Sequence, residues 1–464
     1  MDFLEKLSIK DISEFIGGKF IGTDCYIDKI TTDSRVVDGK SMFVAIKGEK
    51  ADGNDYAADF LNKGGICAVV EKEIEIPKGK SVILVNDTKK ALRDIAEYYR
   101  KQLDVEIVGV TGSVGKTSTK DMLMSVLSCG FKTFATKGNF NNEIGVPLTI
   151  FELDSSYEKA VIEMGMSNFG EISRLTKIVK PSVAVITNIG TAHIGNLGSR
   201  ENILRAKLEI VEGLKENGVL IVNGDDELLA NAGKYTNGKI IYYGVDNKND
   251  DLYAYDIVSN DKGSVFKVKI KKVSYEFKIN VVGRHHIYNA LAAIACGIYF
   301  GMAPGDMIKG VAEFAPSGMR QREIDINGIK IIEDCYNAST SSMESSLCVL
   351  KEISKNNRSI AVLGDVLEQG EFAEKNHREI GKYVLKFGIN TLVTVGYDAL
   401  YIADEAIKEG NKNVFSFSDN KSAAEFLSSY LKSNDTVLFK ASRGMKFEQI
   451  SEQLQLLLKG RNTE

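Results

Sequence analysis

Short apolar runs alternate with stretches of helical spacing along much of this chain. Residues 105–110, 160–162 and 183–186 form runs rich in Val, Ile and Ala, which predicts buried strands of a parallel sheet. Residues 116–127 carry apolar side chains at i and i+4, which predicts a helix directly after the first of these strands. Strands and helices in alternation are typical of α/β domains.

Two later regions refine this pattern. Between residues 253 and 282 the apolar side chains follow a two-residue alternation, which predicts antiparallel hairpins inserted in the α/β domain. Beyond residue 315 apolar runs again alternate with helical patterns, which predicts a second parallel sheet. The expected strands are 329–332, 360–363, 391–395 and 437–439, and the expected helices are 371–387, 398–408, 419–432 and 446–458.

The length of 464 residues corresponds to about three ordinary domains. We predict an α/β protein with a small α/β N-terminal domain, a central parallel-sheet domain that contains the hairpins, and a C-terminal Rossmann-like domain. The predicted boundaries are 1–100, 101–314 and 315–464.

Composition excludes several classes of protein. With 44% hydrophobic and 26% charged residues the chain is an ordinary globular one, and its net charge of −4 argues against a nucleic-acid partner. The six cysteines are scattered without a C-x-x-C pair, which favours reduced thiols in a cytoplasm. The first residues are mixed and amphipathic, unlike a signal peptide, and no apolar run is long enough to span a bilayer. We therefore expect a cytoplasmic protein without membrane insertion.

Residues 111–118, TGSVGKTS, connect the strand at 105–110 to the following helix. Strand, Gly-rich loop and helix is the context in which such a loop binds phosphate, because glycines let backbone N–H groups turn toward the phosphate oxygens. Lys116 would supply a point charge, and Thr117 would offer a hydroxyl to Mg²⁺. The usual G-x-x-x-x-G-K-[ST] spacing would place a glycine at Val110, so a Gly-rich connection without chemistry is the alternative.

Polar residues gather at the ends of predicted strands, where α/β sheets bind ligands. Glu163 ends the strand at 160–162 and could hold Mg²⁺, or point to solvent. His193 follows the strand at 183–186 as a candidate metal ligand or proton donor, although a lone loop histidine is more often solvated. A polar loop at 137–147 is a further binding candidate.

Lys207 lies within the apolar face of a helix predicted over residues 200–214, four residues after Ile203 and three before Ile210. The pattern alone favours an amine that snorkels to solvent. A buried lysine would lose its proton more readily and could react with CO₂ to form a carbamate, which is a carboxylate in function.

Ser34 and Arg35 precede an apolar run at residues 41–46 that predicts a strand of the first domain. The guanidinium fork of Arg35 suits an anion such as phosphate. On composition alone an ordinary surface turn with a solvated arginine is the better interpretation.

These motifs together resemble the Mur ligase family, the ATP-dependent amide-bond ligases of cell-wall precursor synthesis. Residues 111–118 are similar to the family's T-G-[ST]-x-G-K-[ST]-[ST] loop, which explains Val110. Residues 188–193, 206–210 and 286–293 are similar to further motifs of the central domain. The resemblance covers nearly the whole chain, and the combination of motifs is highly specific.

Within the family the likeness is greatest to the branch that adds D-alanyl-D-alanine to UDP-N-acetylmuramoyl-tripeptide. The segments concerned are 138–147, 163–172, 334–338 and 363–368. Two departures stand out. Ser339-Thr340 follows Asn337-Ala338 where a proline is expected, and His285-His286 replaces a more usual single histidine.

The resemblance implies roles for individual residues. The P-loop, Thr111, Gly112, Ser113, Val114, Gly115, Lys116, Thr117 and Ser118, would bind ATP phosphates, with Asn289, Arg320, Asp334 and Asn337 along the nucleotide. Thr117, Glu163, His193 and a carbamylated Lys207 would hold Mg²⁺, and Lys116, Glu163, His193 and Lys207 form the implied catalytic set. Ser34, Arg35, Asn141 and Asn142 would contact the UDP-substrate, and Asp365, Leu367 and Glu368 the dipeptide.

The implied reaction proceeds through an acyl phosphate and releases ADP and phosphate, and the enzyme is expected to be monomeric. The resemblance leaves open whether the third peptide residue is diaminopimelate or lysine. Three alternatives also remain: a ligase adding another amino acid, such as the third-residue Mur ligase or a folylpolyglutamate-type synthetase; a non-catalytic nucleotide-binding scaffold; and a P-loop switch protein.

Overall fold

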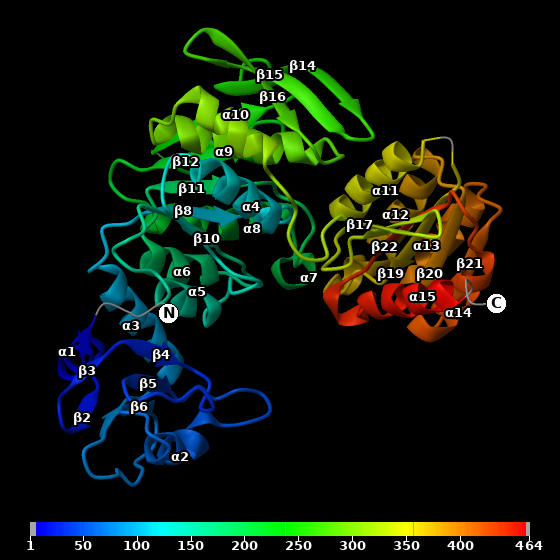
Figure 1. Cartoon of the computed structure of the whole chain (residues 1–464). Coiled ribbons are helices and arrows are strands. Elements are labelled where there is room, and N and C mark those ends of the chain that lie inside the picture. Colours follow the sequence, from blue (N-terminus) through cyan, green and yellow to red (C-terminus); the bar gives the residue numbers. More distant parts are fainter. Residues whose placement is uncertain (1–5, 237, 356, 461–464) are drawn as a thin grey trace. The chain divides into compact units, whose positions relative to one another are not determined.

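The computed structural model describes residues 6–236, 238–355 and 357–460 (Figure 1). The outer ends of the first and third predicted domains, residues 1–5 and 461–464, lie outside the described residues. The chain forms two compact units. The first comprises residues 1–111, 130–185 and 208–220, and the second comprises residues 112–129, 186–207 and 221–464.

The first unit begins with a five-stranded sheet in the order β2-β7-β6-β5-β4. Strand β2 pairs antiparallel with β7, and the other pairs are parallel. The predicted strand at 41–46 is confirmed as β5, two residues shorter, and its Phe43 packs on Phe60 of α2. The elements of this region are β1 (Leu7–Ser8), α1 (Ile9–Ile16), β2 (Lys19–Gly22), β3 (Tyr26–Ile27), β4 (Lys29–Thr31), β5 (Ser41–Val44), α2 (Ala57–Asn62), β6 (Cys67–Val70), β7 (Ser81–Leu84) and α3 (Thr88–Arg100).

A nine-stranded sheet has the order β16-β15-β14-β13-β12-β11-β8-β10-β9. The apolar runs predicted as parallel strands are β8 (Glu106–Thr111), β10 (Lys159–Glu163), β11 (Val183–Ile186) and β12 (Val219–Asn223). Strand β10 pairs in parallel with both β8 and β9, and the alternating region forms antiparallel strands as predicted. These hairpins extend the edge of the sheet instead of forming a separate insertion. The remaining strands are β9 (Thr133–Ala135), β13 (Lys239–Gly244), β14 (Leu252–Asn260), β15 (Gly263–Ile270) and β16 (Val273–Ile279).

The helix predicted over residues 116–127 is confirmed as α4 (Lys116–Leu127). Helix α9 (His285–Tyr299) packs against α4. Helix α10 (Pro304–Ala312) packs on α4 so closely that a β carbon on Gly310 would lie 2.4 Å from Val126 Cα. The other helices are α5 (Gly145–Ile150), α6 (Glu171–Val179), α7 (Ile194–Leu197) and α8 (Arg200–Leu208).

The helix predicted over 200–214 is wrong in its second half, because α8 ends at Leu208 and a 3₁₀ turn, Glu209–Gly213, follows. The Glu209 carboxylate accepts hydrogen bonds from the backbone N–H groups of Gly170 and Ser173, at 2.7 and 3.1 Å, and so caps the first turn of α6. Thr176 Oγ1 donates to the Ile210 carbonyl at 2.8 Å. These tertiary contacts with α6 outweigh the helical pattern.

The C-terminal part of the second unit is a six-stranded sheet in the order β17-β18-β22-β19-β20-β21. The four predicted strands form a parallel sheet as expected, and an additional strand, β17, pairs antiparallel with β18 at one edge. One apolar cluster joins the sheet to α14 and α15, and a second joins it to α11, α12 and α13, so helices cover both faces. The elements are β17 (Arg322–Ile326), β18 (Ile329–Glu333), α11 (Thr340–Ser354), β19 (Ser359–Gly364), α12 (Ala373–Lys386), β20 (Thr391–Val395), α13 (Ala399–Lys408), β21 (Val414–Phe417), α14 (Asn420–Tyr430), β22 (Thr436–Lys440) and α15 (Glu448–Gly460).

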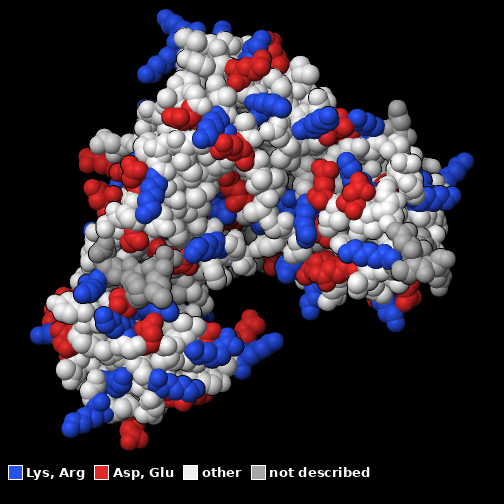
Figure 2. Space-filling model, in the orientation of Figure 1, with Lys and Arg blue, Asp and Glu red and all other residues white. Residues whose placement is uncertain are grey.

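Two observations bear on the surface. Figure 2 shows Lys and Arg interspersed with Asp and Glu over the face in view, as expected for a chain of net charge −4. Within the described residues, no helix combines the length and the apolar character needed to cross a bilayer.

Candidate active site

The Gly-rich loop joins β8 to α4, as the sequence predicts. Gly112 has φ 153° and Gly115 has φ 80°, and Gly115 precedes the first helical residue, Lys116. A β carbon on Gly112 would lie 1.9 Å from Thr187 Oγ1, so only glycine allows the loop to approach the end of β11 this closely. The two glycines therefore provide both the conformation and the space that the turn requires.

Asn188 holds this loop in place. Its Oδ1 accepts from the Val114 N–H at 3.0 Å, and its Nδ2 donates to the Val114 carbonyl at 2.9 Å. The Asn188 carbonyl accepts from the Ser113 N–H at 3.0 Å, and Thr187 Oγ1 donates to the Val114 carbonyl at 2.6 Å. Reasoning from residue chemistry gave Asn188 no role; its place directly after a buried strand was the available signal.

The loop has the features of an anion site. The N-cap residue of α4, Gly115, provides no side-chain cap to the first turn, and the positive end of the helix dipole there attracts anions. Lys116 Nζ donates to the Gly112 carbonyl at 2.8 Å, and Ser118 lies half-buried in the first turn of α4. Among the described residues, the buried Thr111 Oγ1 and Ser113 Oγ have no hydrogen-bond partner, and such groups are rare unless a ligand satisfies them.

Predicted nucleotide-binding residues lie beside the loop. Asn289 Oδ1 accepts from Thr119 Oγ1 at 3.0 Å, and the buried Asn289 Nδ2 is a further unpartnered donor within the described part of the chain. Arg320 Nη2 donates to Thr117 Oγ1 at 3.0 Å, and its guanidinium lies 3.9 Å from the centre of the Tyr336 ring. The structure thus places both Asn289 and Arg320 against the first turn of α4, through Thr119 and Thr117.

Lys207 is buried, with 1% of its surface exposed. The expectation from pattern alone that its amine snorkels is therefore wrong, because Lys207 lies in a buried stretch with Ala206 and Leu208, and in the last turn of α8 only Arg205 is exposed. Loss of hydration, and secondarily the positive charge of Lys116, lowers the pKa of the Lys207 amine well below its usual value. This shift favours the neutral, nucleophilic form of the amine.

His193 lies in the loop between β11 and α7 with φ 61°, in the left-handed region. Its Nδ1 is 2.8 Å from Glu368 Oε2, which joins a predicted metal ligand to a predicted dipeptide-binding residue. Burial, and then the charge of Lys116, lowers the pKa of His193, and the Glu368 carboxylate partly opposes this shift. The imidazole is therefore neutral near pH 7, as a metal ligand must be.

Glu163 ends β10 and is 2% exposed, which excludes the solvent-facing alternative. Its Oε1 accepts from Asn141 Nδ2 at 2.8 Å, and its backbone N–H donates to Thr136 Oγ1 at 3.0 Å. Asn142 Oδ1 accepts from the N–H groups of Ile144 and Gly145, at 3.1 and 2.8 Å, and so caps α5. The two adjacent asparagines have different partners.

The donor set fits Mg²⁺ in part. In the described portions of the chain no three His, Cys, Asp or Glu side chains gather as a metal site. Mg²⁺ prefers oxygen ligands, and the implied set contains one carboxylate, Glu163, and one hydroxyl, Thr117. Conversion of the Lys207 amine into a carbamate would add oxygens, and nucleotide phosphates would add more.

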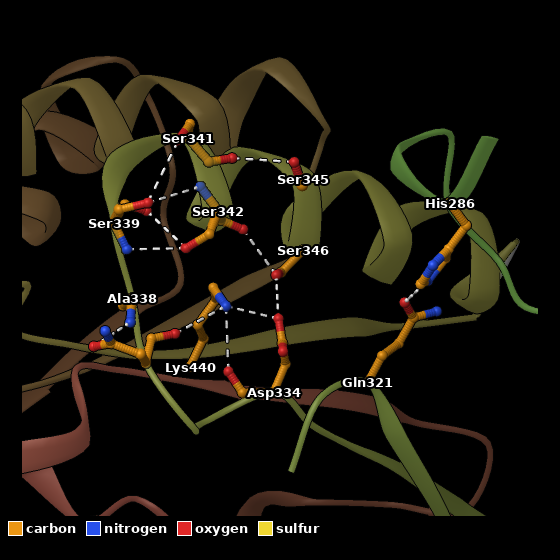
Figure 3. A network of polar contacts seen from close by, with 11 residues as sticks. His286, Gln321, Asp334, Ala338, Ser339, Ser341, Ser342, Ser345, Ser346 and Lys440 are labelled. Carbon is orange, nitrogen blue, oxygen red and sulfur yellow. Dashed lines mark hydrogen bonds and ion pairs between the residues drawn. The ribbon is translucent and has the colours of Figure 1, made fainter. Parts of the chain in front are cut away.

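In the C-terminal sheet, Lys440 organises the segment that follows β18 (Figure 3). Its Nζ donates to Asp334 Oδ2 at 2.7 Å, to the Asp334 carbonyl at 3.3 Å and to the Asn337 carbonyl at 3.4 Å. Ser346 Oγ donates to the same carboxylate oxygen at 2.5 Å. Lys440 is 3% exposed, so this buried cation determines where Asp334 and Asn337 lie. Its place at the end of the strand predicted over residues 437–439 was the available signal in the sequence.

The predicted dipeptide-binding loop follows β19. Asp365 is buried, and its carboxylate accepts from the Tyr397 and Ala399 N–H groups at 3.2 and 2.7 Å, at the start of α13. The Leu367 N–H donates to Ser442 Oγ at 2.9 Å. The Leu367 and Glu368 side chains are exposed, whereas the Asp365 carboxylate is already hydrogen-bonded to the two N–H groups at the start of α13.

Ser34 and Arg35 lie in a turn after β4. The Arg35 guanidinium binds Asp33 through two nitrogens, at 2.8 and 2.7 Å, and is largely exposed. Hydrogen bonds from Arg35 lower the pKa of Asp33 to about 2. An incoming phosphate would compete with this carboxylate for the guanidinium.

Three family models match the chain in succession. Their descriptions are "Mur ligase family, catalytic domain" for residues 26–100, "Mur ligase middle domain" for residues 110–297 and "Mur ligase, glutamate ligase domain" for residues 319–443. The UDP-N-acetylmuramoyl-tripeptide--D-alanyl-D-alanine ligase of Bacillus subtilis is 38% identical over 455 residues, which cover 97% of this chain and 98% of that protein. This chain belongs to the Mur ligase family.

Further comparisons agree with this assignment. The Escherichia coli ligase of the same name is 31% identical over 97% of this chain and 98% of its own. A crystal structure of MurF from Acinetobacter baumannii superposes with a TM-score of 0.89 at 31% identity, covering 98% of this chain and 99% of that one. MurF of Thermotoga maritima in complex with ADP gives a TM-score of 0.83 at 27% identity, covering 93% and 98%. The fold is accordingly the three-domain α/β fold of the Mur ligases.

Proposed function

We propose that this Mur ligase joins D-alanyl-D-alanine to UDP-N-acetylmuramoyl-tripeptide at the expense of ATP, in peptidoglycan precursor synthesis. The observation that carries this proposal is the likeness, along almost the whole chain, to ligases that bear this name. The unpartnered polar groups and the uncapped helix at the P-loop support ATP as the energy source.

The P-loop would hold the phosphates of ATP. Rotation of Lys116 Nζ away from the Gly112 carbonyl would bring its charge to the transferring phosphoryl group. Asn289 and Arg320 beside the loop, and Asp334 and Asn337 held by Lys440, would bind the remainder of the nucleotide.

The reaction requires an activated carboxylate, because a free carboxylate is a poor acyl donor. A carboxylate oxygen of the tripeptide attacks the γ-phosphorus of ATP, and the bond from phosphorus to ADP breaks. The amine of D-alanyl-D-alanine then attacks the acyl carbon and loses a proton, and inorganic phosphate leaves with the former carboxylate oxygen. The acyl phosphate must be shielded from water, and loops that close over the site would provide this.

Thr117, Glu163, His193 and Lys207 are the residues that would hold Mg²⁺, which when bound offsets the charge of the phosphoryl group. Lys207 would take part as a carbamate, since burial favours the neutral form of its amine. Mass spectrometry of intact protein kept in bicarbonate would detect the added CO₂, and the Lys207→Arg variant serves as the unmodified control.

Ser34, Arg35 and Asn142 are proposed to contact the UDP-substrate, and Leu367 and Glu368 the dipeptide. Asp365 would shape the dipeptide loop through its contact with α13. We further propose the domain boundaries 1–100, 101–314 and 315–464, a cytoplasmic location and a monomeric enzyme. The three matched regions each fall within one of these domains, which supports the boundaries.

Phosphate release from ATP tests the function. Release that requires both UDP-N-acetylmuramoyl-tripeptide and D-alanyl-D-alanine is expected. Release with a free amino acid in place of the dipeptide would show that the chain is a ligase that adds another amino acid. ATP binding without turnover would instead support the alternative of a non-catalytic nucleotide-binding scaffold.

A further inference from the structure

Asn141 connects the loop at 137–144 to the end of strand β10. Its Nδ2 donates a hydrogen bond of 2.8 Å to Oε1 of Glu163, the buried carboxylate that is the proposed Mg²⁺ ligand. The resemblance to the family placed Asn141 with Asn142 among the substrate ligands. Its amide is instead directed at Glu163, within the first compact unit of the structure.

The position of this amide is tightly determined. The Asn141 N–H donates to the Asn139 carbonyl at 2.7 Å, and the Asn141 carbonyl accepts from the Gly165 N–H at 2.7 Å. A β carbon on Gly165 would lie 3.1 Å from Asn141 Cγ, closer than packed side chains normally approach. The main chain and Gly165 together hold the Asn141 side chain against Glu163.

Asn142 differs from Asn141 in both exposure and partners. Asn142 is exposed and directs its Oδ1 to the start of α5, whereas Asn141 is half-buried. An N–H donor cannot ligate a cation, but it can fix one oxygen of a carboxylate and thereby orient the other. Groups that orient metal ligands in this way commonly control metal affinity without touching the metal.

We propose that Asn141 is a positioning residue for Glu163, which orients this carboxylate for Mg²⁺ and does not contact the UDP-substrate. The proposal rests on the proposed role of Glu163 as a Mg²⁺ ligand. It predicts that loss of the Asn141 amide weakens divalent-metal binding and leaves the KM for UDP-N-acetylmuramoyl-tripeptide unchanged.

The test compares Asn141→Leu, which removes the donor, with Gly165→Ala, which pushes the amide away and leaves both polar side chains intact. Asn139→Leu is the matched control, because Asn139 is an exposed asparagine of the same loop. Mn²⁺ binding in the presence of a non-hydrolysable ATP analogue, followed by electron paramagnetic resonance of free Mn²⁺, gives a readout that does not depend on turnover. The KM for the UDP-tripeptide is measured in parallel.

We expect Mn²⁺ to bind about 10-fold more weakly to Asn141→Leu, more weakly by a smaller factor to Gly165→Ala, and normally to Asn139→Leu. Wild-type Mn²⁺ affinity in Asn141→Leu would overturn the proposal, whether or not the KM for the UDP-tripeptide rises. If Asn141→Leu does not fold, as judged by thermal unfolding without ligands, Gly165→Ala decides the question by the same criterion.

Failure of the proposed function gives a different result. In that case the wild-type protein would bind Mn²⁺ with nucleotide, and Asn141→Leu would bind it weakly, although no dipeptide is ligated.

Discussion

The side-chain amide of Asn188 spans the Val114 peptide group, accepting from its N–H at 3.0 Å and donating to its carbonyl at 2.9 Å. This pair holds the centre of the P-loop to the end of β11. In Asn188→Leu both hydrogen bonds are lost. At about 1 kcal/mol for each bond, binding of an ATP analogue is expected to weaken by roughly 10- to 30-fold. Isothermal titration calorimetry measures this affinity, and an unchanged value would show that the loop keeps its conformation without Asn188.

The P-loop itself could be predicted because a buried strand, a glycine-rich loop and a helix stand in sequence, and each is a local pattern. The residues that hold it could not, since Thr187 and Asn188 are more than 70 positions away and contact it only through the fold. Strand β17 was not predicted either, because its charged side chains at Arg322, Glu323 and Asp325 interrupt the apolar run that marks a central strand.

Lys207 shows a different limit of sequence reasoning. Its position on the apolar face was visible, but whether such a lysine snorkels depends on what covers the end of the helix. The sequence also did not show that the helix ends at Leu208, where Glu209 leaves the helical path to cap α6. The buried Asp365 carboxylate is a similar case. Its hydrogen-bond donors at 397 and 399 follow the next strand along the chain, so the contact forms only once the sheet has assembled.

The buried amine of Lys207 leads to a prediction about activity. Lys207→Arg places a permanent positive charge at this position, and arginine can neither lose its proton at neutral pH nor form a carbamate. Turnover is expected to fall by at least about 100-fold, whereas ADP binding without metal, measured by calorimetry, changes little. Near-normal turnover in Lys207→Arg would exclude a carbamate from the mechanism.

Asp250 predicts a pH dependence of stability. Burial, and then the charge of Asp225, raises the pKa of Asp250 to about 6, and within the described residues its Oδ2 is a buried atom without a hydrogen-bond partner. The folded state therefore binds more protons than the unfolded state between about pH 4 and 6, so stability falls as the pH rises through this range.

Asp250→Asn removes this titration and keeps an acceptor for the Asn247 amide. At pH 7.5 the variant is expected to be more stable than wild type by about 1–2 kcal/mol, since partial solvation reduces the full effect of the shift. The difference should shrink toward pH 4.5. Urea unfolding at several pH values measures it, and a difference independent of pH would contradict the assignment.

Lys440 is the cation on which the segment from Asp334 to Asn337 depends. Lys440→Met removes three hydrogen bonds and leaves the half-buried Asp334 carboxylate without its charge partner, which is expected to cost about 2–4 kcal/mol of unfolding free energy. Ser346→Ala removes one hydrogen bond to the same carboxylate and should cost only about 1 kcal/mol. Chemical denaturation compares the two variants, and equal effects would show that the charge of Lys440 is unimportant.

The most direct test of the central claim follows an oxygen atom from the tripeptide to phosphate. UDP-N-acetylmuramoyl-tripeptide labelled with ¹⁸O in its terminal carboxylate is incubated with ATP, Mg²⁺ and D-alanyl-D-alanine, and both products are analysed by mass spectrometry. Attack of the carboxylate on the γ-phosphorus predicts one ¹⁸O in the released phosphate for each pentapeptide formed. Unlabelled phosphate, or phosphate released without pentapeptide, would contradict the account.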